Sequence, residues 1–116
     1  MGSFRAFLRC LRGASLAQRG RKLLRAGRSD EGRTLLVEAL TLLGPGEPSG
    51  SNVGVWFSQR VTSLCDLSVA AAQAGDVEDA LRRIDEGTAL WAQMGLEASK
   101  YPHVQEWLTW ADAYAR

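Results

Sequence analysis

Apolar residues recur at intervals of three and four along most of the chain, and this spacing places them on one face of an α-helix. Between Val55 and Ala74 the only charged residues are Arg60 and Asp66, so a helix here is apolar on most of its sides. Such a helix belongs in the middle of a bundle or stack. Strand patterns are nearly absent, and the sequence therefore predicts an all-α fold.

Glycines divide the predicted helices from one another. We expect breaks at Gly13, Gly27, Gly75 and Gly95, because glycine adopts the left-handed backbone that ends many helices. Residues 44–54 contain four glycines and two prolines and predict a flexible loop, which at 11 residues is either mobile or functional. The pattern predicts about six helices, which begin near residues 3, 15, 29, 55, 77 and 102.

The sequence contains one internal repeat. The stretch AGRSDEGRTLLVEALTLLG, residues 26–44, is echoed by AGDVEDALRRIDEGTALWAQMG, residues 74–95. In both copies a helix ends at Ala-Gly, and an acid-rich helix follows about two residues later, with Ser29 or Asp76 as the expected N-cap. The repeat predicts two antiparallel helical hairpins, in which glycine or alanine at the crossing lets the two helices approach closely.

This repeat resembles the tetratricopeptide repeat (TPR), a helix-turn-helix unit of 34 residues. The clearest match is the run Gly-Asp-Val-Glu-Asp-Ala-Leu at residues 75–81, which is similar to the turn and second-helix opening of that family. A third, half unit with the spacing W-x2-L-G-x2-Y is formed by Trp107, Trp110, Ala111 and Tyr114. The resemblance covers residues 14–116, although Gly27 and Gly75 are 48 residues apart rather than 34.

The resemblance implies a domain organisation and a function. Residues 1–13 form a basic amphipathic helix, and residues 14–116 form antiparallel hairpins stacked as a short TPR-like solenoid, with two repeats and a C-terminal capping half repeat. In the TPR family the first helices of the repeats line a groove that binds a peptide or helix of a partner protein. The resemblance therefore implies a non-enzymatic adaptor or scaffold.

The groove positions can be carried over from the family by spacing. The resulting partner-binding residues are Arg21, Leu24, Arg25, Thr62, Cys65, Val69, Gln73, Leu108 and Asp112. Some TPR proteins hold a C-terminal carboxylate with basic and neutral side chains. Here Asp66 and Gln105 replace such groups, so we do not expect a carboxylate clamp.

Aromatic residues gather near the C-terminus, where five of the nine lie in the last 26 residues. Two interpretations stay open for Trp107, Trp110 and Tyr114. They either form the core side of a capping helix, or they dock on another copy of the chain or on a partner, because Trp and Tyr dominate interface energetics. On the second interpretation, Trp110→Ala converts an oligomer into a monomer.

The formal net charge of +1 hides an asymmetry. Residues 1–33 hold nine basic and two acidic residues, a balance of +7, and residues 34–116 hold five basic and eleven acidic residues, a balance of −6. The basic segment has three interpretations: a solvated face that partly pairs with later acids, a targeting segment, or a patch that binds nucleic acid or an anionic membrane surface. The patch residues are Arg5, Arg9, Arg12, Arg19 and Lys22.

Length and composition narrow the remaining function classes. The 116 residues suggest one domain, and no apolar run approaches the roughly 20 residues that span a bilayer. One histidine, His103, and two cysteines predict neither a metal site nor a disulfide framework, and they favour a reducing, cytoplasmic location. Cys65 is expected in the core rather than as a nucleophile. We expect no enzymatic activity, cofactor or small-molecule substrate.

Overall fold

The computed structural model describes residues 2–44 and 53–116, and these residues contain helices and turns but no strand. The all-α prediction is therefore confirmed for them. Residues 45–52, most of the predicted loop, lie outside the described residues. The elements are α1 (Gly2–Arg25), α2 (Ser29–Leu43), α3 (Val53–Gln73), α4 (Val77–Gln93), the short 3-10 helix η2 (Gly95–Lys100) and α5 (Pro102–Ala115).

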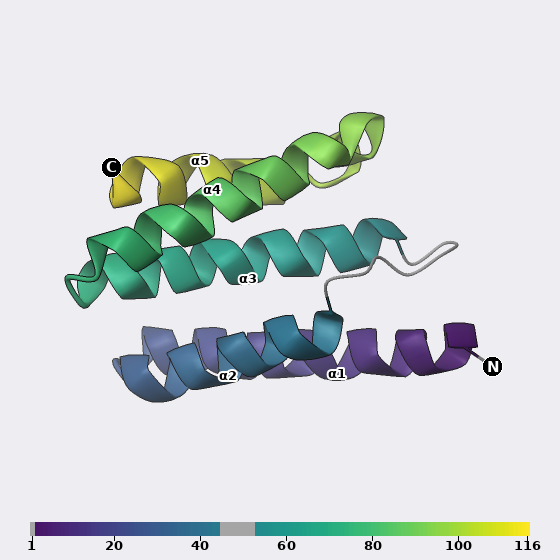
Figure 1. Cartoon of the computed structure of the whole chain (residues 1–116), viewed down its shortest axis with the longest axis horizontal. Coiled ribbons are helices and arrows are strands. Elements are labelled where there is room, and N and C mark those ends of the chain that lie inside the picture. Colours follow the sequence, from purple (N-terminus) through teal and green to yellow (C-terminus); the bar gives the residue numbers. More distant parts are fainter. Residues whose placement is uncertain (1, 45–52) are drawn as a thin grey trace.

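The helices form two hairpins and a fifth helix (Figure 1). Helices α1 and α2 run antiparallel and pack on each other, α3 and α4 do the same, and α5 packs on both α3 and α4. Helix α3 contacts all four other α-helices. This central position explains why its sequence is apolar on most sides, as the charge pattern predicted.

The first hairpin turns at Gly27, as predicted. Its φ of 81° lies in the left-handed region, where a side chain is strained. The N–H of Arg28 donates a hydrogen bond to the carbonyl of Leu23 at 2.8 Å, which closes the turn and satisfies one of the last carbonyls of α1. The predicted stops at Gly75 and Gly95 are also confirmed, with φ values of 82° and 56°.

The predicted break at Gly13 is wrong. Helix α1 runs without interruption through Gly13, so Ser15 starts no helix, and residues 2–44 and 53–116 form five α-helices where about six were expected. A Cβ added to Gly13 would lie 2.8 Å from Cγ of Leu43. Gly13 is therefore small because α2 passes close to it, and the expected boundary between residues 13 and 14 falls inside one helix.

The core lies along both sides of α3. One cluster joins α3 to the first hairpin through residues such as Leu36 and Leu64, and a second joins it to α4 and α5 through residues such as Val61 and Ile84. All four of these side chains are fully buried. The packing of the first hairpin, α4 and α5 against α3 fixes the relative positions of α1, α3 and α5.

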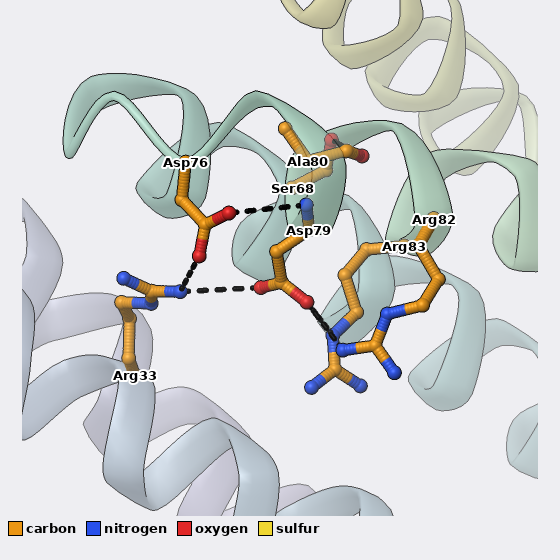
Figure 2. Close-up of polar contacts among 7 residues, drawn as sticks. All are labelled: Arg33, Ser68, Asp76, Asp79, Ala80, Arg82 and Arg83. Carbon is orange, nitrogen blue, oxygen red and sulfur yellow. Dashed lines mark hydrogen bonds and ion pairs between the residues drawn. The ribbon is translucent and has the colours of Figure 1, made fainter.

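A polar cluster connects the two hairpins at the α3–α4 turn (Figure 2). Arg33 of α2 reaches Asp79 with Nη2–Oδ2 at 3.1 Å and Asp76 with Nη2–Oδ2 at 3.7 Å. Asp76 caps α4 by accepting a hydrogen bond from the N–H of Asp79 at 3.3 Å, as predicted. Some arginines of the basic segment therefore pair with later acids, as one of the three interpretations proposed.

Candidate functional site

A groove of about 390 Å³ lies across helices α1, α3 and α5. Its walls combine cationic, aromatic, apolar and polar side chains from all three helices. The residues that line it are Arg21, Leu24, Arg25, Thr62, Asp66, Val69, Gln73, His103, Val104, Trp107 and Trp110.

Helix α3 provides the central row of the groove. Thr62, Asp66, Val69 and Gln73 follow one another at intervals of four, three and four residues, so they share one face of the helix. The other faces of α3 pack into the two core clusters. Because this helix is held on several sides, the central row is set by the core and does not depend on a ligand.

Asp66 joins all three helices at the centre of the groove. Its side chain is 3% exposed, and Oδ2 accepts a hydrogen bond from Nε of Arg21 on α1 at 2.8 Å. Its Oδ1 accepts a hydrogen bond from Nε1 of Trp107 on α5 at 3.0 Å. Burial raises the pKa of Asp66, and the charge of Arg21 opposes this rise. The carboxyl group therefore positions one cation and one indole ring in the groove.

Stacked aromatic rings form the α5 wall. The ring centroids of Trp107 and Trp110 are 4.8 Å apart with planes inclined by 12°, and Trp110 in turn stacks on Tyr114 at 5.3 Å. Trp107 is half-buried, whereas Trp110 is 49% exposed and Tyr114 is 45% exposed. The interpretation of these residues as the core of a capping helix is wrong for Trp110 and Tyr114, which present apolar surface to solvent.

The charges on the groove leave one cation in excess. The carboxylate of Asp66 is already paired with Arg21. Arg25 is exposed and has no ion pair or hydrogen bond to another side chain in the part of the chain that the structure describes. His103 is also exposed at the α5 side. The groove therefore favours a ligand with a negative group near Arg25.

Six of the nine predicted partner-binding residues line the groove and three do not. Cys65 and Leu108 are buried in the core behind it, and Asp112 is paired with Arg116, with Oδ1–Nε at 2.9 Å. The correction on α3 is a shift of one residue, from Cys65 to Asp66, and one residue turns a helix by about 100°. The residues that line the groove as predicted are Arg21, Leu24, Arg25, Thr62, Val69 and Gln73.

None of the α5 residues that line the groove was among the predicted groove positions. Trp107 and Trp110 were expected either in the core of a capping helix or on a surface that docks on another copy or on a partner, and His103 and Val104 were assigned to no site. The four residues recur at intervals of one, three and three, which marks one face of a helix. This spacing was a signal in the sequence that could have placed them together.

The residues of the predicted basic patch are exposed to solvent. They are Arg5, Arg9, Arg12, Arg19 and Lys22, all on α1.

Among the described residues, the structure shows no activated cysteine and no cluster of metal-ligating side chains. Burial raises the pKa of both thiols, at Cys10 and at Cys65, so neither is an activated nucleophile. No three His, Cys, Asp or Glu side chains in the described ranges lie together in a way that could hold a metal ion. None of the helices described here combines the length and the apolar content that a bilayer span requires.

Comparisons with protein-family models, with curated proteins and with solved structures find no match to this chain. The resemblance to TPR proteins is thus neither supported nor contradicted by them. The groove on α1, α3 and α5 is therefore the basis for proposing a function.

Proposed function

We propose that this protein is a non-enzymatic adaptor, and that its groove binds a peptide segment of a partner protein. The observation that carries the proposal is the groove itself, which three helices line and a buried Asp66 holds together. We interpret the two hairpins and α5 as a short TPR-like solenoid, with α1, α3 and α5 as its inner helices. This order agrees with the contacts of α3 with α1 and α5.

The groove suits a segment with one acidic and one apolar side chain. Arg25 offers a guanidinium that makes no ion pair or side-chain hydrogen bond in the described ranges, although its charge acts on Asp66, and a guanidinium binds a carboxylate with two parallel hydrogen bonds. Trp110 offers a half-exposed ring in the same groove, against which an apolar or aromatic side chain can pack. A volume of about 390 Å³ is within the range of ligand sites and accommodates a few side chains.

Selection from random peptides displayed on phage tests this proposal. We expect the selected peptides to share an acidic residue close to an apolar or aromatic one. Binding of a selected peptide, measured by tryptophan fluorescence, is expected to weaken about tenfold or more in Arg25→Glu and in Trp110→Ala. Val37→Ser, which changes an exposed apolar residue of α2, serves as the control and leaves affinity unchanged.

Two results would contradict the peptide-binding proposal. One is a selection that yields no common pattern. The other is a set of peptides whose affinity is unaffected by both Arg25→Glu and Trp110→Ala. Circular dichroism of each variant excludes loss of the fold as the cause of weaker binding.

Self-association is the second candidate function, and the exposed stack of Trp110 and Tyr114 favours it. Sedimentation equilibrium distinguishes it from peptide binding. If the protein is an oligomer that becomes monomeric in both Trp110→Ala and Tyr114→Ala, a second copy occupies this aromatic surface. A wild-type protein that is monomeric at all concentrations removes this candidate and leaves the peptide proposal intact.

A further inference from the structure

The first three turns of α1 present apolar side chains to solvent rather than to the core. Phe4 is 64% exposed, Phe7 38%, Leu8 42% and Leu11 51%. At about 100° per residue, these four side chains fall within one stripe of the helix surface. The opposite side of α1 carries Gly13, which is buried against Leu43 of α2, so the stripe faces away from the protein.

A row of arginines runs beside this apolar stripe. Arg5, Arg12 and Arg19 recur every seven residues, so they lie on one line along α1 with about 10 Å between neighbours, and Arg9 adjoins them. All four are exposed, and none has an ion pair within the residues that the structure describes. Helix α1 contains no acidic residue. The row is therefore a line of cations without compensating charge on its own helix.

The N-terminal turns of α1 are also accessible as a unit. Figure 1 shows them, in purple, extending beyond the end of α2. Helix α1 has 24 residues and α2 has 15, so α2 is too short to accompany α1 to its first turn. A flat surface can therefore approach the stripe and the arginine row together.

We propose that this face of α1, from Phe4 to Arg19, binds the surface of an anionic membrane. The apolar side chains enter the boundary between headgroups and acyl chains, and the arginines contact lipid phosphates and carboxylates. Charge complementarity decides among the alternatives. A nucleic acid would neutralise the arginines but leave Phe4 and Leu8 in water, and a second copy would bring like charges together.

The membrane face and the groove share helix α1 but are centred at different heights along it. The apolar stripe is centred about 15 residues before Arg21 and Arg25, a distance of roughly 20 Å along the helix axis. The membrane proposal itself does not depend on peptide binding.

Co-sedimentation with vesicles tests the proposal on the full chain. We expect binding to vesicles of phosphatidylcholine with phosphatidylserine, and weaker binding both to phosphatidylcholine alone and at high salt. The double variant Phe4→Ser/Leu8→Ser is expected to bind about tenfold or more weakly, because each residue buries an apolar side chain. The matched control Val37→Ser/Leu96→Ser changes two exposed apolar residues elsewhere and leaves binding unchanged.

A second pair of variants tests the charge. Arg5→Gln/Arg12→Gln is expected to weaken binding to anionic vesicles about tenfold, with little effect on neutral ones. Arg28→Gln/Arg116→Gln removes the same charge at a distance from the stripe and should have a much smaller effect. Circular dichroism confirms that all four variants keep the helical fold.

Four outcomes overturn the membrane proposal. Absence of vesicle binding at low salt is one, and vesicle binding that is insensitive to Phe4→Ser/Leu8→Ser is another. Binding of DNA or RNA through the same arginines, without vesicle binding, assigns the row to nucleic acid. An oligomer that Phe4→Ser/Leu8→Ser converts to a monomer, again without vesicle binding, assigns the stripe to a second copy.

Discussion

The two helical hairpins turn in the same way but cross by different means. In the first, the N–H of Arg28 donates to the carbonyl of Leu23, and in the second the N–H of Asp76 donates to the carbonyl of Ala71, both at 2.8 Å. The glycine that precedes each donor has φ near 80°. The turns are therefore equivalent, and the differences between the hairpins begin in the helices.

At the crossing itself, the first hairpin has two glycines where the second has larger residues. A Cβ on Gly32 would lie 2.8 Å from the carbonyl oxygen of Gly20, so the two backbones are almost in contact. The positions 48 residues later hold Ser68 and Ala80, and Oγ of Ser68 donates a hydrogen bond to the carbonyl of Ala80 at 2.7 Å. Figure 2 shows these two residues side by side.

This difference shows that one repeat can support two kinds of helix packing. In the first hairpin the two helix backbones touch each other at Gly20 and Gly32, and a side chain at either position would prevent this contact. In the second hairpin the helices are joined by the methyl group of Ala80 and by the hydrogen bond from Ser68, for which such a close approach would leave no room. Equivalent positions in the two copies therefore differ in what they tolerate, although their turns do not.

Substitution of Gly32 by Ala should have the largest effect on stability. The added Cβ meets backbone of the facing helix at Gly20, and also Cδ2 of Leu24 at 2.9 Å, so α1 and α2 must separate. We expect a loss of about 3 kcal/mol in the free energy of unfolding, measured by denaturant titration.

Gly87→Ala is the matched control for this prediction. Gly87 is buried in α4, but a Cβ there would lie 3.5 Å from Cβ of Leu64, which is ordinary contact. Because alanine is the better helix former, we expect an increase in stability of up to about 1 kcal/mol. Equal effects of the two substitutions would show that the crossing of the first hairpin is not limited by backbone contact.

The equivalence of the turns can be tested by Gly27→Ala and Gly75→Ala. Both glycines have positive φ, and an added Cβ would have nothing within 4 Å at either position. The effect is therefore that of the backbone alone, and we expect each variant to lose about 1–2 kcal/mol of unfolding free energy. A difference between them larger than the error of the titration would contradict the equivalence.

These comparisons also show which parts of the fold the sequence could predict. Turn chemistry is local, so the Ala-Gly turns and the cap at Asp76 were predicted correctly. The cap at Ser29 was not: α2 begins at Ser29 itself, and no side chain caps it. Gly13 was assigned to a helix end because a glycine that ends a helix and a glycine that admits a neighbour look the same until the neighbour is known.

The helices that line the groove were predicted correctly, but some of the lining residues were not. The reason is again that the sequence alone does not show the long-range neighbours of each helix. Carrying positions over from a 34-residue repeat fixes which helices face the groove, but not the rotation of each helix about its axis. That rotation depends on long-range partners. Asp66 takes the position expected for Cys65 because Arg21 and Trp107, 45 and 41 residues away, satisfy its carboxylate. A single sequence does not reveal such a pairing.

The smallest predicted effect concerns the ion pair of Arg33 with Asp79, which connects the two hairpins. The substitution Arg33→Gln removes this ion pair. Burial alone would raise the pKa of Asp79, but the hydrogen bond from Arg82, the charges of Arg83 and Arg82 and the hydrogen bond from Arg33 lower it below the ordinary value of 3.8. A carboxylate with a lowered pKa stabilises the fold above its unfolded-state pKa, and this contribution is lost as pH falls through its folded-state pKa. The contact of Arg33 with Asp79 should therefore stabilise the protein at neutral pH and not in strong acid.

We accordingly expect Arg33→Gln to lower the free energy of unfolding by about 0.5–1 kcal/mol near neutral pH, since the pair is only partly buried. The deficit should shrink towards zero as Asp79 becomes protonated, and denaturant titrations of both proteins along a pH series measure this. Arg82→Gln is the comparison variant, because Arg82 contacts Asp79 from within α4 and connects no hairpins. If the deficit of Arg33→Gln stays constant down to strong acid, the arginine acts through its packing on α4, and the ion pair does not hold the two hairpins together.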